Sequence, residues 1–123
     1  DARMGPVQYD LVSLLHDSYV DMQPKMQAKL LSYYIDKAEE NFNQKFDLDE
    51  FNEIMHVQLV QRCFKACGSF SSFLNTRNDR RYLHYIHPTL VKVVNTLETM
   101  GEFSTLKNVL VDKGLMEIDY EAL

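Results

Sequence analysis

Apolar residues recur along most of the chain at intervals of three and four, which is the spacing of one face of an α-helix. Helix breakers are sparse, since the sequence has only four Gly and three Pro. The alternation of apolar and polar residues that is typical of a strand persists nowhere. The pattern therefore predicts an all-α fold of about five helices, in a single helical domain over residues 1–123.

The first two helices are expected over about residues 7–20 and 24–43. Pro6 and Pro24 stand at their beginnings, where a proline fits because the first-turn N–H groups have no partner within the helix. The expected apolar face of the first helix consists of Leu11, Leu14, Leu15 and Tyr19. That of the second consists of Met26, Leu30, Leu31, Tyr34, Ile35, Ala38 and Phe42.

The third helix has the clearest start signal in the chain. Asp47 can cap it, Glu50 follows at capping-box spacing, and Phe46 can pack on Phe51. We expect this helix to continue to about Asn75. Its expected buried face consists of Phe51, Ile54, Met55, Val60, Cys63, Phe64, Cys67, Phe70 and Leu74.

The remaining chain is expected to hold a polar loop over 76–81, a short turn over 82–86 and two more helices. Pro88 should open the fourth helix and Gly101 should end it. Ser104 should cap the fifth, which should stop at Gly114. The apolar positions expected in these two helices are Val91, Val94 and Leu97, followed by Leu106, Val109 and Leu110.

Composition and net charge restrict the classes of protein to which the chain can belong. An apolar fraction of 46% with 25% charged residues is ordinary for a globular protein, and a net charge of −5 argues against a nucleic-acid or membrane partner. No apolar run is long enough to span a bilayer, and the start does not resemble a signal peptide. Cys63 and Cys67, four residues apart on one helix, suit reduced thiols. We expect a cytoplasmic protein.

Two patterns in the sequence resemble metal sites. Oxygen-bearing side chains at Asn41, Asn43, Asp47 and Glu50 resemble part of a calcium loop, but Gln44 stands where the loop needs Gly, and Glu39 replaces its first Asp. A helix end followed by a capping box explains these residues better.

The second pattern that resembles a metal site is a candidate zinc-binding set made of Cys63, Cys67, His84 and His87. Both cysteines lie on the apolar face, where buried Cys acts mainly as a small hydrophobe. We therefore expect no metal site in this chain.

The only local cationic cluster consists of Arg77, Arg80, Arg81 and His84. It can bind a phosphate or an acidic partner through bidentate hydrogen bonds, but a solvated loop is the simpler interpretation. No catalytic triad, glycine-rich phosphate loop or nucleophile elbow is found in the sequence.

The N-terminal string DARMGPVQYDLVSLLHDSYV resembles a segment of the aminoglycoside phosphotransferase-like kinases, in particular the anomeric N-acetylmuramate/N-acetylglucosamine kinases of bacterial cell-wall recycling. Those kinases have an IDFQDA-like motif followed by GP-x-x-YDL-x-SLL-x-D. The positions that match are Asp1, Ala2, Gly5, Pro6, Tyr9, Asp10, Leu11, Ser13, Leu14, Leu15 and Asp17. The stretch 61–83 and Pro88 also resemble the family, so that the likeness covers most of residues 1–100.

The resemblance implies that the chain is the C-terminal helical subdomain of a protein-kinase-like fold, and a piece of a longer protein. The nucleotide lobe, the catalytic loop and the metal-binding Asp would all precede Asp1, which resembles the acidic residue that trails the metal motif. Asp10 would support the catalytic loop by accepting hydrogen bonds from its backbone. Its place in a first helical turn, where a carboxylate is favoured, is a sufficient alternative explanation.

The implied parent protein is an ATP- and Mg-dependent phosphotransferase acting on a sugar or amino sugar. Phosphoryl transfer needs a lysine, metal ligands and a base, so this piece should hold no cofactor, contain no catalytic residue and be inactive alone. Its partners would be the rest of the kinase chain and, in the parent, the sugar acceptor; self-association is also expected. The alternative is an independent helical protein-interaction module without catalysis.

Overall fold

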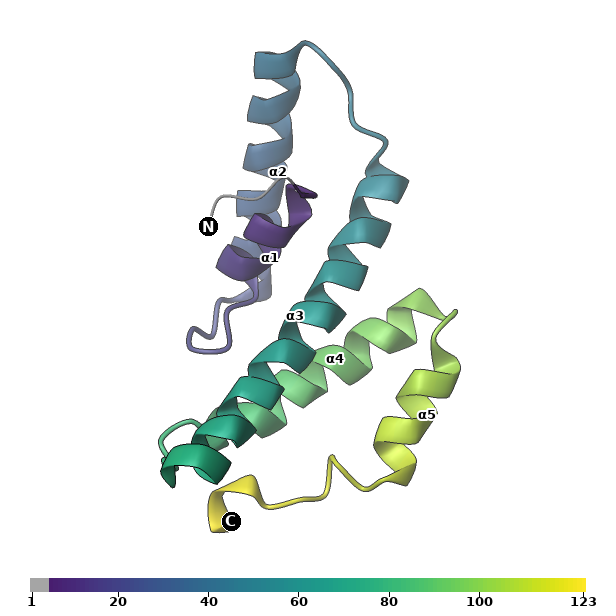
Figure 1. Cartoon of the computed structure of the whole chain (residues 1–123). Helices are drawn as coiled ribbons and strands as arrows, with labels where there is room; N and C mark the ends of the chain where they lie inside the picture. The colour runs from purple at the N-terminus through teal and green to yellow at the C-terminus, as the bar shows by residue number, and fades with distance from the viewer. Residues whose placement is uncertain (1–4) are drawn as a thin grey trace. The chain divides into compact units, whose positions relative to one another are not determined.

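The computed structural model describes residues 5–123 (Figure 1). Within these residues the chain forms five α-helices and no strand, which confirms the predicted all-α class. The elements are α1 (Gln8–Leu15), α2 (Pro24–Phe42), α3 (Leu48–Arg77), the 3-10 turn η1 (Leu83–Tyr85), α4 (Ile86–Met100), α5 (Ser104–Asp112) and the 3-10 turn η2 (Tyr120–Ala122).

Contacts along the chain group it into two compact units, residues 1–58 and 59–123. The described part of the first unit holds α1, α2 and the beginning of α3. The second holds the rest of α3, together with η1, α4, α5 and η2. The single domain over residues 1–123 stays a prediction.

Helix α1 is shorter than expected, because it ends at Leu15 and does not continue to residue 20. The Gln27 side chain donates a hydrogen bond to the Leu15 carbonyl (2.8 Å), and the Asp17 carboxylate accepts one from the Tyr19 N–H (2.8 Å). These side-chain bonds replace helical ones and turn the chain. The expected face was also partly wrong, since Val12 is buried while Leu14 and Tyr19 are exposed.

Helix α2 matches its expected range and packs against α1. Only Ala38 of its expected face is fully buried, whereas Met26 and Phe42 are exposed. Asn43 ends the helix in the left-handed conformation (φ 50°), which Asn tolerates better than most residues.

The start of α3 is as the sequence predicts. The Asp47 carboxylate accepts hydrogen bonds from the N–H groups of Asp49 (3.0 Å) and Glu50 (3.2 Å), and the rings of Phe46 and Phe51 lie 5.3 Å apart. Leu59 is buried where Val60 was expected, because the buried face advances in steps of four from Met55. The helix ends at Arg77, two residues beyond the expected Asn75.

In the second unit η1 leads directly into α4. Buried residues of both elements, Leu83 and Leu90 among them, cluster with Cys67 and Phe70 of α3. Helix α4 begins at Ile86, so Pro88 lies inside its first turn and does not open it. Its buried face runs through Leu90, Val93 and Leu97, whereas the expected Val91 and Val94 are half-buried. Gly101 ends the helix at φ 68°, as expected.

Helix α5 packs on α4 through Leu110, and the Lys107 ammonium pairs with Glu98 of α4 at 2.6 Å. Ser104 is the first helical residue, and Phe103 occupies the cap position without a side-chain hydrogen bond, so the expected Ser104 cap was wrong. Leu106 and Val109 are exposed. No helix within residues 5–123 combines the length and apolarity needed to cross a bilayer.

Candidate functional site

Asp10 lies in the first turn of α1, the helix that carries the string resembling the kinases. Its side chain is exposed, and its main-chain N–H donates to the Val7 carbonyl (3.2 Å). Within residues 5–123 the carboxylate accepts no hydrogen bond and forms no ion pair. A carboxylate at this position is favoured by the helix dipole and is accessible to backbone donors of another segment.

Helix α1, which carries Asp10, is held in place by buried side chains and a side-chain hydrogen bond. Leu11, Val12 and Leu15 are buried on the opposite side of the short helix, and the Gln27 bond fixes its last turn. Asp1, which resembles the acidic residue trailing the metal motif, lies outside the described residues.

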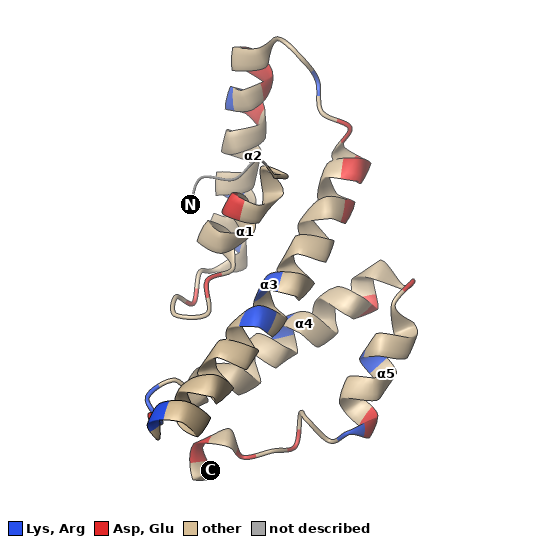
Figure 2. Ribbon diagram, viewed as in Figure 1, with Lys and Arg blue, Asp and Glu red and all other residues tan. Residues whose placement is uncertain are grey.

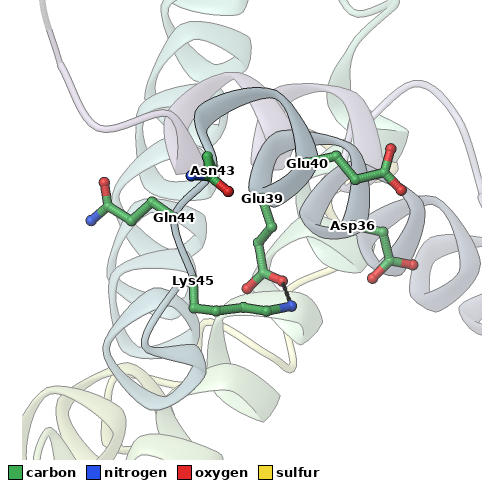
Figure 3. Close-up of a pocket in the computed structure, with 6 residues that line it drawn as sticks. All are labelled: Asp36, Glu39, Glu40, Asn43, Gln44 and Lys45. Carbon is green, nitrogen blue, oxygen red and sulfur yellow. Dashed lines mark hydrogen bonds and ion pairs between the residues drawn. The ribbon is translucent and has the colours of Figure 1, made fainter.

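The segment that resembles part of a calcium loop forms a clasp around Glu39 (Figure 3). One Glu39 oxygen accepts a hydrogen bond from the Phe46 N–H (2.9 Å), and the other pairs with the Lys45 ammonium. The Lys45 hydrogen bond, followed by that from Phe46, lowers the pKa of Glu39. Both carboxylate oxygens of Glu39 therefore bind residues of the segment between α2 and α3.

A surface pocket surrounds this clasp, with Asp36, Glu40, Asn43 and Gln44 on its walls (Figure 3). The Glu40 carboxylate pairs with Lys37 at 2.6 Å, one helical turn away on α2. Asp47, another position of the supposed loop, caps α3. Lys45 and backbone N–H groups thus bind the carboxylates of Glu39 and Asp47, which stand at two of the positions that a calcium ion would need.

The thiols are buried on α3. The Cys67 sulfur lies 3.9 Å from the Ile86 carbonyl, and burial raises the pKa of both Cys63 and Cys67, for Cys67 to about 12. His84 and His87 are exposed. No group of three or more His, Cys, Asp or Glu side chains within residues 5–123 is arranged to hold a metal ion.

Arginines lie at the end of α3 and in the loop that follows it, where Figure 2 shows them in blue. Arg81 forms a two-point pair with Asp79, the Arg77 guanidinium lies 5.4 Å from the centre of the Phe73 ring, and Arg80 donates to the main-chain oxygen of Leu123. Asp79, which is not among the candidate residues of the sequence analysis, binds both the backbone and the side chain of Arg81. A sequence signal for this was present, since an Asp side chain in a turn often accepts a hydrogen bond from the backbone N–H two residues on, as Asp79 does from Arg81.

Comparison with known proteins gives one informative similarity. The chain is 28% identical over 117 residues to an N-acetylmuramate/N-acetylglucosamine kinase of Neisseria meningitidis serogroup B. The aligned part covers 91% of this chain but only 34% of that kinase. No protein-family model and no solved structure matches the chain.

Proposed function

We propose that this chain is the C-terminal helical portion of an ATP-dependent phosphotransferase that acts on a sugar or amino sugar. The observation that carries the proposal is the similarity to the Neisseria kinase along 91% of the chain. The all-helical fold agrees with it. Because the chain spans about a third of that relative, the whole activity would need residues outside it.

In this proposal Asp10 supports the catalytic loop. Helix α1 is anchored by buried leucines, and its exposed carboxylate can accept hydrogen bonds from the N–H groups of a loop that lies against it. Hydrogen bonds to a charged acceptor are about twice as strong as neutral ones, so they would restrict the loop's position. Restricting the position of catalytic groups is a large part of phosphoryl-transfer catalysis.

Mg-ATP is assigned to the rest of the kinase. Residues 5–123 bring no three His, Cys, Asp or Glu side chains together in a metal site, and Arg77, Arg80 and Arg81 contact Phe73, Leu123 and Asp79. In this proposal the metal ion and the phosphates are held by residues outside the described part of the chain. The contribution of residues 5–123 would be a support for the catalytic loop and part of the wall of the acceptor pocket.

The alternative, an independent interaction module, has its own observation. Several large apolar side chains of the first unit are exposed, including Leu14, Tyr33 and Phe42. Exposed apolar patches tend to mark contact surfaces. In the kinase proposal the same side chains face the missing part of the protein, and the isolated chain should self-associate.

The deciding experiment starts from the complete coding sequence that contains this chain. Its product should release ADP from Mg-ATP only when N-acetylmuramate, N-acetylglucosamine or a related sugar is added, as measured by a coupled assay. The isolated chain is the matched control, and calorimetry should find no binding of Mg-ATP to it. A complete product without a catalytic loop and without sugar-dependent ADP release would favour the interaction module.

A further inference from the structure

The last residues of the second unit return to the end of α3 after α5. Residues 113–123, here termed the C-terminal strap, begin at a turn in which Gly114 has a φ of 65°, and they end in η2, which packs on η1. Figure 1 shows this segment in yellow beside the C-terminal end of α3. The strap therefore reaches an element far from it in sequence through a path without regular helix.

The strap covers an apolar cluster made of Cys67, Phe70, Leu83, Ile86 and Leu90. Three of its side chains pack on this cluster while remaining partly exposed: Leu115, Met116 and Tyr120. Tyr120 lies close enough to Cys67 for the two groups to affect each other electrostatically, although burial is the larger cause of the raised pKa of Tyr120. Tyr120 is thus part of the cover over the Cys67 thiol.

Most hydrogen bonds of the strap join two residues within the strap. The Tyr120 hydroxyl donates to the Leu115 carbonyl (2.7 Å), and the Asp119 carboxylate accepts from the N–H groups of Glu121 (3.2 Å) and Ala122 (3.3 Å). Arg80 reaches the Leu123 main-chain oxygen from the loop after α3. Because these local bonds survive when the segment moves as a whole, opening would cost mainly the partial burial of three side chains, the Arg80 bond and the bond from the Leu115 N–H to the Leu110 carbonyl of α5.

We propose that the C-terminal strap opens while the helices of the second unit stay folded, and that it thereby controls access to Cys67 and to the apolar cluster beneath it. In the closed state Cys67 is buried. Because its pKa is raised to about 12, only a small fraction of the molecules carry a Cys67 thiolate near neutral pH. Opening would expose the sulfur to water and to reagents. Segments with few buried contacts open in this way below the free energy of global unfolding.

The test measures thiol reactivity with an aromatic disulfide reagent such as 5,5′-dithiobis(2-nitrobenzoate). Cys67 loses its proton to solvent, its thiolate forms a disulfide with one sulfur of the reagent, and the reagent's own disulfide breaks to release a coloured aryl thiolate. Peptide mass spectrometry assigns each modification to Cys67 or Cys63. The rate at Cys67 then reports how often the strap is open.

We expect Tyr120→Ala to raise the modification rate of Cys67 at least about tenfold and Arg80→Gln to raise it severalfold, with circular dichroism and melting temperature close to those of the unchanged protein. Cys63 should keep its rate. Tyr33→Ala, which changes an exposed tyrosine of the first unit, should leave both thiols unaffected. An unchanged Cys67 rate in folded Tyr120→Ala protein, or equal acceleration of both thiols, overturns the proposal.

Hydrogen exchange on the unchanged protein gives a second measurement that needs no variant. The Leu115 amide donates to the Leu110 carbonyl of α5, so its hydrogen bond joins the strap to the helix and breaks when the strap opens. This amide should exchange much faster than the amides of α4 around Val93. Equal protection of the strap and α4 would show that the two unfold together and would overturn the proposal.

Discussion

Asp79 and Arg81 form a two-point ion pair at the turn that follows α3. The Arg81 Nη2 lies 2.7 Å from one Asp79 oxygen, and its Nε lies 3.0 Å from the other. The Asp79 carboxylate also accepts a hydrogen bond from the Arg81 main-chain N–H at 3.1 Å. The pair therefore fixes both the side chain and the backbone of the turn that leads into η1.

This pair should contribute a pH-dependent part of stability. The Arg81 side-chain hydrogen bond, helped by the Arg81 N–H, lowers the pKa of Asp79 from 3.8 to about 2. Because the folded pKa is below the ordinary one, the contribution is present above about pH 4 and lost as the pH falls through about 2. Asp79→Asn should lower the melting temperature by a few degrees at most at pH 6, and the difference should shrink toward pH 2.

Arg81→Gln serves as the matched partner variant for the pair. If the pair acts as one unit, the double variant should lose no more stability than the more harmful of the two single variants. The Asp79 side chain is only 17% exposed, whereas that of Arg81 is 78% exposed. Because the Asp79 carboxylate also binds the Arg81 main-chain N–H, Asp79→Asn should be the more harmful of the two changes. Additive losses at pH 6 would show that the two residues act separately.

The cap of α3 should be worth a measurable amount. Asp47→Ala removes the acceptor for the Asp49 and Glu50 N–H groups and should lower the free energy of unfolding by about 1 kcal/mol. Urea denaturation followed by circular dichroism measures it. Asn52→Ala, an exposed change one turn into the helix, is the control and should have little effect. Equal losses in the two variants would contradict the capping role of Asp47.

The core of the second unit should be most sensitive at Leu97. This side chain is 1% exposed, so Leu97→Ala leaves a cavity and should cost about 3 kcal/mol of unfolding free energy. Leu106 on α5 is 38% exposed, and Leu106→Ala should cost less than about 1 kcal/mol. Thermal unfolding of the two variants side by side measures the contrast. A large loss at Leu106 instead would mean that α5 is buried in solution.

Local chemistry made part of this fold predictable from sequence. The Asp47 cap and the Phe46 to Phe51 contact depend only on neighbouring residues, and a left-handed residue such as Gly101 ends a helix whatever lies beyond it. The all-α class follows from periodicity in the same way. These features need no knowledge of what packs where.

Features that depend on distant contacts were missed. The carbonyl at the end of α1 is bound by Gln27 of another helix. Val12 is buried where Leu14 was expected, because the two residues flank Leu11 and Leu15 on either side and only tertiary packing decides between them. The Glu39 clasp joins residues seven apart through a loop. For the candidate site, sequence resemblance singled out Asp10, while periodicity alone could not tell that its side chain is exposed.

The strongest test of the proposed function is Asp10→Asn in the complete enzyme. The amide keeps the shape of the carboxylate but removes the charge that strengthens hydrogen bonds from backbone donors. If Asp10 positions the catalytic loop, kcat should fall, by up to about a hundredfold if catalytic groups shift by an ångström, with a smaller change in the KM for ATP. Steady-state kinetics with the sugar acceptor measure both.

The effect of Asp10→Asn on catalysis has to be separated from its effect on the helix. A carboxylate in the first turn of α1 interacts favourably with the helix dipole, so Asp10→Asn should also lower the free energy of unfolding slightly, by about 0.5 kcal/mol. Asp21→Asn, an exposed change outside the helices, is the matched control and should leave kcat unchanged. A normal kcat for Asp10→Asn, together with this small loss of stability, would mean that Asp10 serves only its own helix. Because a loss of folded protein lowers all rates alike, a fall in kcat counts for the positioning role only when the melting curve shows the variant folded at the assay temperature.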